Sequence, residues 1–407
     1  MRWWPSACRR VGGGFLRCNG LVDADIEDLA PPAVLAQVVP RRSTLLLRAP
    51  RALVVVTAAV FAFLGDASAV GEKPGDPQRA PVTLPLRAQG SMPSLDGAVQ
   101  WLNSPPLTAA ALRGKVVLVQ FWTYSCINWQ RTLPHVRAWA EKYKDHGLVV
   151  IGVHTPEFSF EKDLDRIRRA LAHFKVDYPV AVDSHRAVWS AFGNNFWPAL
   201  YFVDAQGTIR HHHFGEGDFE RSERVLQQLL KAAGAKDVPA DTVRVTGTGS
   251  QAQADWANLR TPETYVGHDR AENFASPSGM TVGRTVRYAA PERLRPKAWA
   301  LAGDWTVGRE VALLEGKQGR IVHRFRARDL HLVMGPATQG RPVAFRVRLD
   351  GKPPGSAHGA DIDAQGRGVL AEHRLHQLVR QPQPVGDRLF EIEFEDEGVE
   401  VYAFTFG

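Results

Sequence analysis

The fold of this chain is decided by one stretch, Val116-Val-Leu-Val-Gln-Phe-Trp-Thr-Tyr-Ser-Cys-Ile-Asn-Trp129. Its first half, Val116–Trp122, is almost wholly apolar, which predicts a central strand covered on both faces. A long helix is predicted over Ile127–His146, because apolar side chains recur there at three- and four-residue spacing: Leu133, Val136, Ala140 and Tyr143. The chain therefore changes from a buried strand to a helix at Cys126.

The position of Cys126 has a chemical consequence. At the N-terminus of a helix, free N–H groups and the helix dipole favour an anion. The thiolate, not the thiol, is the nucleophile, so this position favours a reactive sulfur. A buried structural cysteine fits the same strand-to-helix position equally well, and both interpretations stay open on position alone.

Strands and helices alternate after this helix, which predicts a compact α/β domain. The predicted elements are a strand at Leu148–Val153, a helix at Glu161–Phe174, a hairpin of Ala199–Val203 and Thr208–Phe214, and a closing helix at Phe219–Ala232. The hairpin is predicted because the turn Asp204-Ala-Gln-Gly207 separates two apolar runs.

The second half of the chain has a different pattern. Residues 70–93 and 233–255 are rich in Pro, Gly or small polar residues and are predicted linkers. After residue 255, apolar and polar residues alternate, and such patterning with tight turns predicts an antiparallel β-sandwich. The alternating apolar positions include Val343, Phe345, Val347, Leu349, Phe390, Ile392 and Phe394.

Composition and charge narrow the classes of function. The 407 residues, 44% of them hydrophobic and 23% charged, suffice for two or three globular domains. The net charge is +7, but no run of Lys or Arg with interleaved aromatic residues is present. We therefore expect a mixed, solvated surface and no nucleic-acid partner.

Residues 1–69 have the order of a secretory leader. The apolar run 52–64 follows four arginines between residues 41 and 51 and precedes the small-x-small site Ala67-Ser68-Ala69. The run is short for a membrane span, although an uncleaved run can still act as an anchor. The leader predicts a protein that works outside the cytoplasm, in the periplasm or cell envelope.

The cysteine count supports the same compartment. The chain has three cysteines, and this odd, low number argues against a disulfide scaffold. Cys8 and Cys18 lie in the leader, so Cys126 is the only cysteine expected in the mature protein. Export places that thiol where disulfide exchange is possible.

The motifs around Cys126 resemble the TlpA/DipZ-like branch of the thioredoxin and redoxin (AhpC/TSA) superfamily. Further motifs that agree are Leu133-Pro134, Gly152-Val-His-Thr-Pro-Glu-Phe158, Trp197-Pro-Ala-Leu-Tyr-Phe-Val-Asp204 and His211-His-His-Phe-Gly-Glu-Gly217. Three later motifs look like the DipZ-type C-terminal domain: Thr261-Pro-Glu-Thr-Tyr-Val-Gly267, Gly303-Asp-Trp-Thr-Val-Gly308 and Tyr402-Ala-Phe-Thr-Phe-Gly407.

This resemblance implies a fold for each half. It implies an α/β thioredoxin-like fold over residues 94–232, followed by an all-β sandwich of the jelly-roll, carbohydrate-binding-module-like kind over residues 256–407. DipZ proteins also carry a membrane-embedded electron-transfer region. Since this chain shows none, a membrane electron donor would be supplied by another protein.

The resemblance also assigns residues to the site. Cys126 matches the attacking cysteine, and Pro198 matches the cis-proline that faces it. Trp129 stands where a C-x-x-C site has the second cysteine, which attacks the mixed disulfide and releases product. Gln120 stands where many thioredoxins bury a carboxylate. An indole at Trp129 could cover the sulfur and raise the thiol pKa against the helix dipole, which leaves the net direction open.

Two further residues are candidate neighbours of Cys126. His154 ends a predicted strand, where α/β sites tend to form, although a satisfied loop histidine is the commoner case. Thr123 makes with Cys126 the T-x-x-C pattern of peroxiredoxins, whose single cysteine is oxidised to sulfenic acid. Val119 stands where a peroxiredoxin would have proline, which weakens that hypothesis.

The sequence contains only weak indications of a metal site or a sugar-binding site. Of His211-His212-His213, only His211 and His213 share a face of a strand, and no further ligand is evident, so no metal is expected. Trp299 and Trp305 could form a sugar-stacking platform, but buried tryptophans are the commoner use in a sandwich.

The sequence therefore predicts an exported thiol oxidoreductase relative with one active-site cysteine, its C-x-x-C pair degraded to C-x-x-W. Such a protein would be weak, or would act as a monothiol, on protein and small-molecule thiols and disulfides, and would need no cofactor. Two alternatives remain open. One is a redox-inactive scaffold that binds envelope carbohydrate or a protein partner, and the other is peroxiredoxin-like reduction of peroxide by one cysteine.

Overall fold

The computed structural model describes residues 84–407. The predicted leader 1–69 with its apolar run 52–64, Cys8, Cys18 and most of the linker 70–93 lie outside the described residues. Within residues 84–407, no helix is long and apolar enough to cross a membrane.

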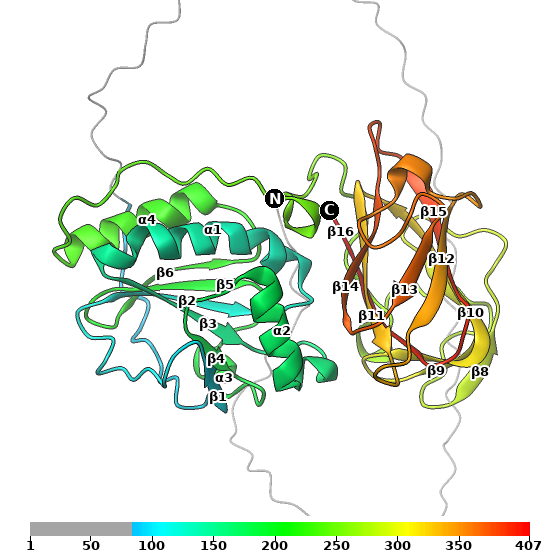
Figure 1. Cartoon of the computed structure of the whole chain (residues 1–407), viewed down its shortest axis with the longest axis horizontal. Helices are drawn as coiled ribbons and strands as arrows, with labels where there is room; N and C mark the ends of the chain where they lie inside the picture. The colour runs from blue at the N-terminus through cyan, green and yellow to red at the C-terminus, as the bar shows by residue number, and fades with distance from the viewer. Residues whose placement is uncertain (1–83) are drawn as a thin grey trace, which may run out of the picture. The chain divides into compact units, whose positions relative to one another are not determined.

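A six-stranded mixed sheet is the centre of the N-terminal half (Figure 1). Its order is β1 (Gln100–Leu102), β4 (Val180–Val182), β3 (Leu148–His154), β2 (Val116–Trp122), β5 (Ala199–Val203) and β6 (Ile209–Phe214). Strand β2 pairs in parallel with β3 and antiparallel with β5, and all seven of its residues are buried. The stretch that predicted a central strand is therefore the middle of the sheet.

Helices cover both faces of this sheet. Helices α1 (Ile127–Tyr143), α2 (Leu164–Phe174) and α4 (Phe219–Ala232) share one core with Val116 and Leu118 of β2. The short helix α3 (Ala187–Ala191) packs on the other face, against Val117, Val119 and Phe121. The remaining turns of 3-10 helix in this half are η1 (Lys144–His146) and η2 (Ser159–Lys162). The thioredoxin-like α/β fold is confirmed.

Two predicted helix boundaries are wrong. The helix predicted over Ile127–His146 ends at Tyr143, and the 3-10 turn η1 continues it to His146. The helix predicted over Glu161–Phe174 begins only at Leu164, because the carboxylate of Asp163 accepts hydrogen bonds from the backbone N–H groups of Asp165 and Arg166. Glu161 lies ahead of this cap and is fully buried. Glu161 therefore lies outside α2, and its carboxylate can accept hydrogen bonds from the preceding loop.

The C-terminal half is one antiparallel sheet of ten strands, so the predicted all-β class is confirmed (Figure 1). The strands are β7 (Thr264–Tyr265), β8 (Thr285–Tyr288), β9 (Trp299–Val307), β10 (Ala312–Arg326), β11 (Asp329–Pro336), β12 (Val343–Leu349), β13 (Arg367–Leu370), β14 (Arg374–Arg380), β15 (Asp387–Phe394) and β16 (Val399–Phe406). The turns η3 (Gly249–Gln251), η4 (His268–Arg270) and η5 (Gly355–Ala357) complete the secondary structure.

The alternation of apolar and polar residues in β12 and β15 places the apolar side chains of both strands on one face of the sheet. Phe345 lies opposite Phe394 and Val347 opposite Ile392, and these apolar pairs belong to the core. On the other face Arg346 lies opposite Glu393. At the end of β12, Asp350 and Gly351 both have positive φ, 52° and 76°, as a tight hairpin turn requires.

Trp299 and Trp305 belong to the core of this domain. Both side chains are fully buried, and their indole N–H groups donate to the carbonyl oxygens of Glu272 and Ala302. Neither ring can therefore form a sugar-stacking platform at the surface.

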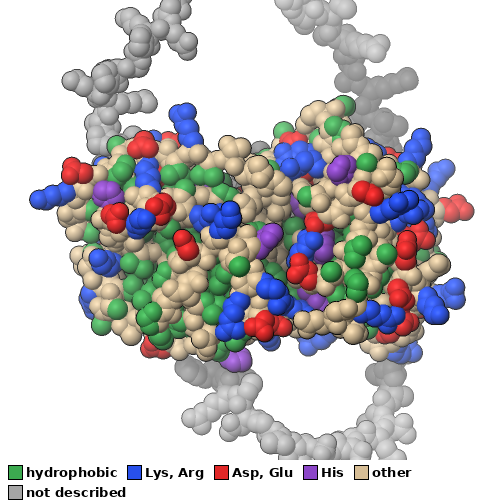
Figure 2. Space-filling model, in the orientation of Figure 1, with side chains coloured by type: hydrophobic (Ala, Val, Ile, Leu, Met, Phe, Trp, Pro, Cys, Tyr) green, Lys and Arg blue, Asp and Glu red, His purple; other side chains and the backbone are tan. Residues whose placement is uncertain are grey.

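Basic and acidic side chains are interspersed on the face shown in Figure 2. They do not gather there into a patch of one sign. This mixed surface is the one expected from the composition.

Candidate active site at Cys126

Cys126 is the N-cap residue of α1. Its backbone is extended, its N–H donates to the carbonyl of Thr123 at 3.3 Å, and its carbonyl accepts from Gln130 N–H at 3.0 Å. The thiol points to the carbonyl oxygen of Trp197, 3.7 Å from Sγ, and the Trp197–Pro198 bond is cis. The structure therefore brings together Cys126 and the loop that holds Pro198.

The electrostatics of this position do not favour a thiolate. Removal of the sulfur from water raises the pKa of Cys126 well above its usual value, and the negative charges of Glu157 and Glu263 raise it further. The N–H groups of Trp129 and Asn128 at the start of α1 lower the pKa but do not outweigh burial. The helix N-terminus lowers this pKa as expected, but desolvation is the larger effect, so the net direction that the sequence left open is upward.

Trp129 is a core residue. Its side chain is fully buried, stacks on Trp122 with ring centroids 4.4 Å apart, and meets Phe174 edge-on at 5.1 Å. Trp129, three residues after Cys126, thus fills the space between β2, α1 and α2.

The residues predicted around the sulfur are all buried. Gln120 accepts a hydrogen bond on Oε1 from the hydroxyl of Tyr178 at 3.0 Å, so it is a polar core residue. His154 lies edge-on to Trp122 at 4.8 Å, and burial lowers its pKa to about 3. A neutral imidazole there cannot stabilise a thiolate by charge. Thr123 is fully buried and contributes the carbonyl that accepts from Cys126.

Glu161 is a site residue that was not predicted from the sequence. Its Oε1 accepts from Ser125 Oγ at 2.6 Å, and its Oε2 accepts from the N–H groups of Glu157 at 2.7 Å and Phe158 at 3.0 Å. Burial raises its pKa to about 7, although these hydrogen bonds oppose the rise. Glu161 therefore joins the residue before Cys126 to the loop after β3.

The second half of the chain also contributes to this site. Phe158 and Phe160 pack on Tyr402 of β16, with ring centroids 5.1 and 4.7 Å apart. Glu263 and Tyr265, from the motif that resembles the DipZ-type domain, lie close enough to act on Glu157 and the sulfur. The sequence alone does not indicate that this motif contributes to the site.

Comparisons with known proteins agree with this geometry. Residues 96–212 match the AhpC/TSA family, and residues 261–407 match the family described as thioredoxin like C-terminal domain. Thiol-disulfide oxidoreductase YkuV of Bacillus subtilis is 30% identical over 145 residues, which are 36% of this chain and 97% of that protein. The chain belongs to the thioredoxin-like thiol-disulfide oxidoreductase family.

A longer relative matches both halves of this family member. Protein DipZ of Mycobacterium tuberculosis is 38% identical over 331 residues, 79% of this chain. The match spans 44% of the length of DipZ. Among solved structures, the solution structure of a thioredoxin-like protein in the oxidised form has 33% identity and a TM-score of 0.33, covering 35% of this chain and 96% of that one.

The histidine run does not form a metal site in the described structure. His211 and His213 lie on β6 opposite Phe202 and Leu200, and burial lowers the pKa of both. His212 hydrogen-bonds Gln89 through Nδ1 at 2.8 Å. Among residues 84–407, no three His, Cys, Asp or Glu side chains are grouped as metal ligands.

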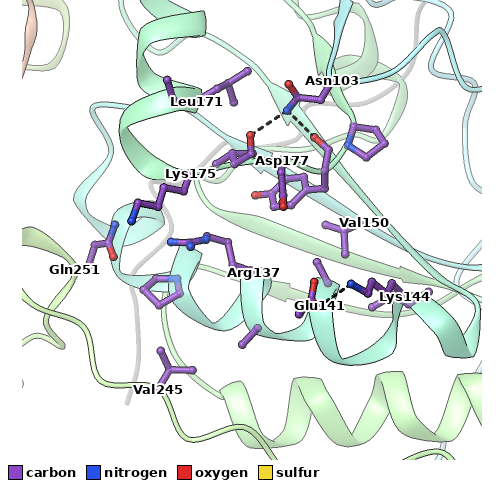
Figure 3. A pocket seen from close by; sticks show the side chains of 18 of the residues that line it. Asn103, Arg137, Glu141, Lys144, Val150, Leu171, Lys175, Asp177, Val245 and Gln251 are labelled. Carbon is purple, nitrogen blue, oxygen red and sulfur yellow. Dashed lines mark hydrogen bonds and ion pairs between the residues drawn. The ribbon is translucent and has the colours of Figure 1, made fainter.

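A groove of about 1240 Å³ lies along α1 and the C-terminal end of α2 (Figure 3). Arg137, Lys175 and Gln251 extend toward one another there, and Asn103 donates to the carbonyl oxygens of Val176 and Tyr178, both at 3.0 Å. Of the residues described above around Cys126, only Tyr178 lines this groove, and Cys126 itself does not. It is therefore separate from the thiol site.

Proposed function

We propose that this protein is a single-cysteine thiol oxidoreductase of the periplasm or cell envelope, with Cys126 as nucleophile and Pro198 beside it. The observation that carries the proposal is the thiol facing the Trp197 carbonyl at the start of α1, while a core tryptophan occupies position 129. The site keeps the attacking thiol and has no second thiol one turn away.

The chemistry has two steps. The Cys126 thiolate attacks a disulfide R–S–S–R′, forms Cys126–S–S–R and releases R′–S⁻, which takes up the proton lost by Cys126. An external thiol then attacks the mixed disulfide, leaves as a new disulfide with R, and restores Cys126. Protein thiols and small thiols are the proposed partners, and a donor in the membrane would be a separate protein.

The compartment is part of the proposal. The leader at residues 1–69, with its apolar run 52–64, supports export, followed either by cleavage or by anchoring at the run. The domain limits are proposed at 94–232 and 256–407, with the segment 233–255 between them.

Insulin reduction in the presence of dithiothreitol tests the proposal. We expect the protein to accelerate insulin precipitation far less than a C-x-x-C relative, because it has no internal thiol to release product. The control is Cys126→Ser, which should remove whatever acceleration is present. A rate equal to that of the C-x-x-C relative would refute the single-cysteine mechanism.

A redox-inactive scaffold is the second candidate, and one observation favours it. Burial and two nearby carboxylates raise the pKa of Cys126, so little thiolate forms at neutral pH. In that case the protein would bind a protein partner or envelope carbohydrate through other surfaces. The fully buried Trp299 and Trp305 would not be the sugar contacts.

A further inference from the structure

Four side chains from the two halves of the chain meet beside Cys126. The hydroxyl oxygen of Tyr265 lies 2.8 Å from Oε1 of Glu157 and 2.8 Å from Oε2 of Glu263. Nη1 of Arg270 lies 2.9 Å from Oε1 of Glu157, and its guanidinium covers the Tyr265 ring at 3.4 Å. The phenol therefore bridges two carboxyl groups, of which only one is paired with a cation.

The number of hydrogens available to Tyr265, Glu157 and Glu263 determines the protonation state of this group. A phenol has one O–H and can donate to only one of the two carboxyl groups. If both were ionised, the second contact would place a negatively charged oxygen against an oxygen lone pair. Two contacts of 2.8 Å therefore require one further proton, held by a carboxyl group that donates to Tyr265.

Glu263 is the group that holds this proton. Arg270 pairs with Glu157, whose side chain is 9% exposed, at 2.9 Å. Among residues 84–407, no Lys, Arg or His side chain lies within ion-pair distance of Glu263. Desolvation and the charge of Glu157 raise the pKa of Glu263 to about 7. Part of Glu263 remains exposed, although its carboxyl group at Tyr265 is desolvated, so its proton can exchange with water.

Hydrogen bonds connect this bridge to the residue beside the sulfur. The N–H of Glu157 donates to Glu161, and Glu161 accepts from both the N–H and the hydroxyl of Ser125. Ser125 directly precedes Cys126. Glu157 is thus held at a fixed place relative to the thiol, and the charges of Glu157 and Glu263 both raise the pKa of Cys126.

We propose that the C-terminal domain supplies Glu263 as the titratable carboxyl of the Cys126 site, sharing one proton with Glu157 through Tyr265. Glu263 acts on the sulfur through its charge and is a positioning residue for the proton, not a nucleophile. It would provide the titratable group that Gln120 does not. Its importance for disulfide exchange rests on the proposed function, whereas its protonation does not.

The sign of the effect follows from the charges. Below pH 7 Glu263 is neutral, and the sulfur faces only Glu157, which Arg270 compensates. As the pH rises through about 7, Glu263 ionises and adds a negative charge near the sulfur. That charge disfavours the thiolate, so the reactivity of Cys126 rises less steeply with pH than that of an isolated thiol.

The test is the rate of Cys126 alkylation by iodoacetamide from pH 5.5 to 9.5 in the protein and in Glu263→Gln. We expect equal rates below about pH 6, and a roughly three- to tenfold faster reaction of Glu263→Gln above pH 8, equivalent to about 0.5–1 pKa unit. Glu161 titrates in both proteins and cancels in the ratio. Glu395→Gln, which alters an exposed carboxyl group directly after β15, is the matched control and should follow the unaltered protein.

A change that is equal at all pH values would indicate only a structural role and would overturn the proposal. Infrared spectroscopy gives an independent readout that needs no reactivity at Cys126. At pH 6 the difference spectrum between the protein and Glu263→Gln should contain the carbonyl band of an un-ionised carboxylic acid, and at pH 9 it should not. A carboxylate band at pH 6 would equally overturn the proposal, whatever the outcome of the insulin assay.

Discussion

Replacing Trp129 by cysteine is expected to lower the free energy of unfolding by about 3–5 kcal/mol while it raises disulfide reductase activity. The loss of stability follows because the indole is fully buried and stacked on Trp122, and a cysteine leaves most of that volume empty. The gain in activity follows because a thiol three residues after Cys126 can attack the mixed disulfide. Urea denaturation and insulin reduction measure the two effects.

Trp129→Ser is the matched control for this variant. Serine leaves the same cavity and supplies no thiol, so it should lose the same stability and gain no activity. If Trp129→Ser were as active as Trp129→Cys, the gain would come from loosening the core and not from a restored thiol pair. A stability loss below about 1 kcal/mol would show that Trp129 does not fill the core as described.

Replacing Arg131 by methionine is expected to cost about 3–5 kcal/mol of folding free energy. Arg131 is on α1, and its side chain is 1% exposed and pairs with Glu216, itself 3% exposed, at 3.4 Å. The same Nη1 also donates to the carbonyl of Phe406 at 3.4 Å, near the C-terminal end of β16. Methionine would leave Glu216 buried without a cation, and chemical denaturation measures the loss.

A double variant distinguishes the contribution of the Arg131–Glu216 ion pair to stability from the contribution of side-chain packing. Arg131→Met combined with Glu216→Leu removes both charges and should recover most of the lost stability, because an apolar pair no longer carries an uncompensated charge. Arg137→Met on the same helix, which lies on the groove, should change stability by less than about 1 kcal/mol. Equal losses in the single and double variants would contradict the ion-pair explanation.

The elements predicted correctly from the sequence are those with a strong local signal. The strand at Val116–Trp122 and the helix at Phe219–Ala232 have the predicted bounds, because a continuous apolar run and a helical apolar stripe need no tertiary context. Strands β1 and β4 and helix α3 were not predicted, since segments of three to five residues are too short to show a period.

The site could be predicted only in part. Cys126 and Pro198 were found through the motifs of the resemblance, and the structure places the carbonyl of Trp197 against the thiol. Glu157 and Tyr265 are 108 residues apart, and only the packing of the two halves brings them together. The raised pKa of Cys126 also could not be predicted from the sequence, because it depends on the burial of the sulfur and on Glu263 from the second domain.

In the proposed mechanism, Cys126 exchanges with a disulfide once and then needs an external thiol to be released. Mass spectrometry of the protein after incubation with glutathione disulfide at pH 8.5 tests this claim most directly. We expect slow addition of a single glutathionyl group at Cys126, which persists after the disulfide is removed and is released by added dithiothreitol. No adduct at Cys126, or an adduct that disappears without added thiol, would contradict it.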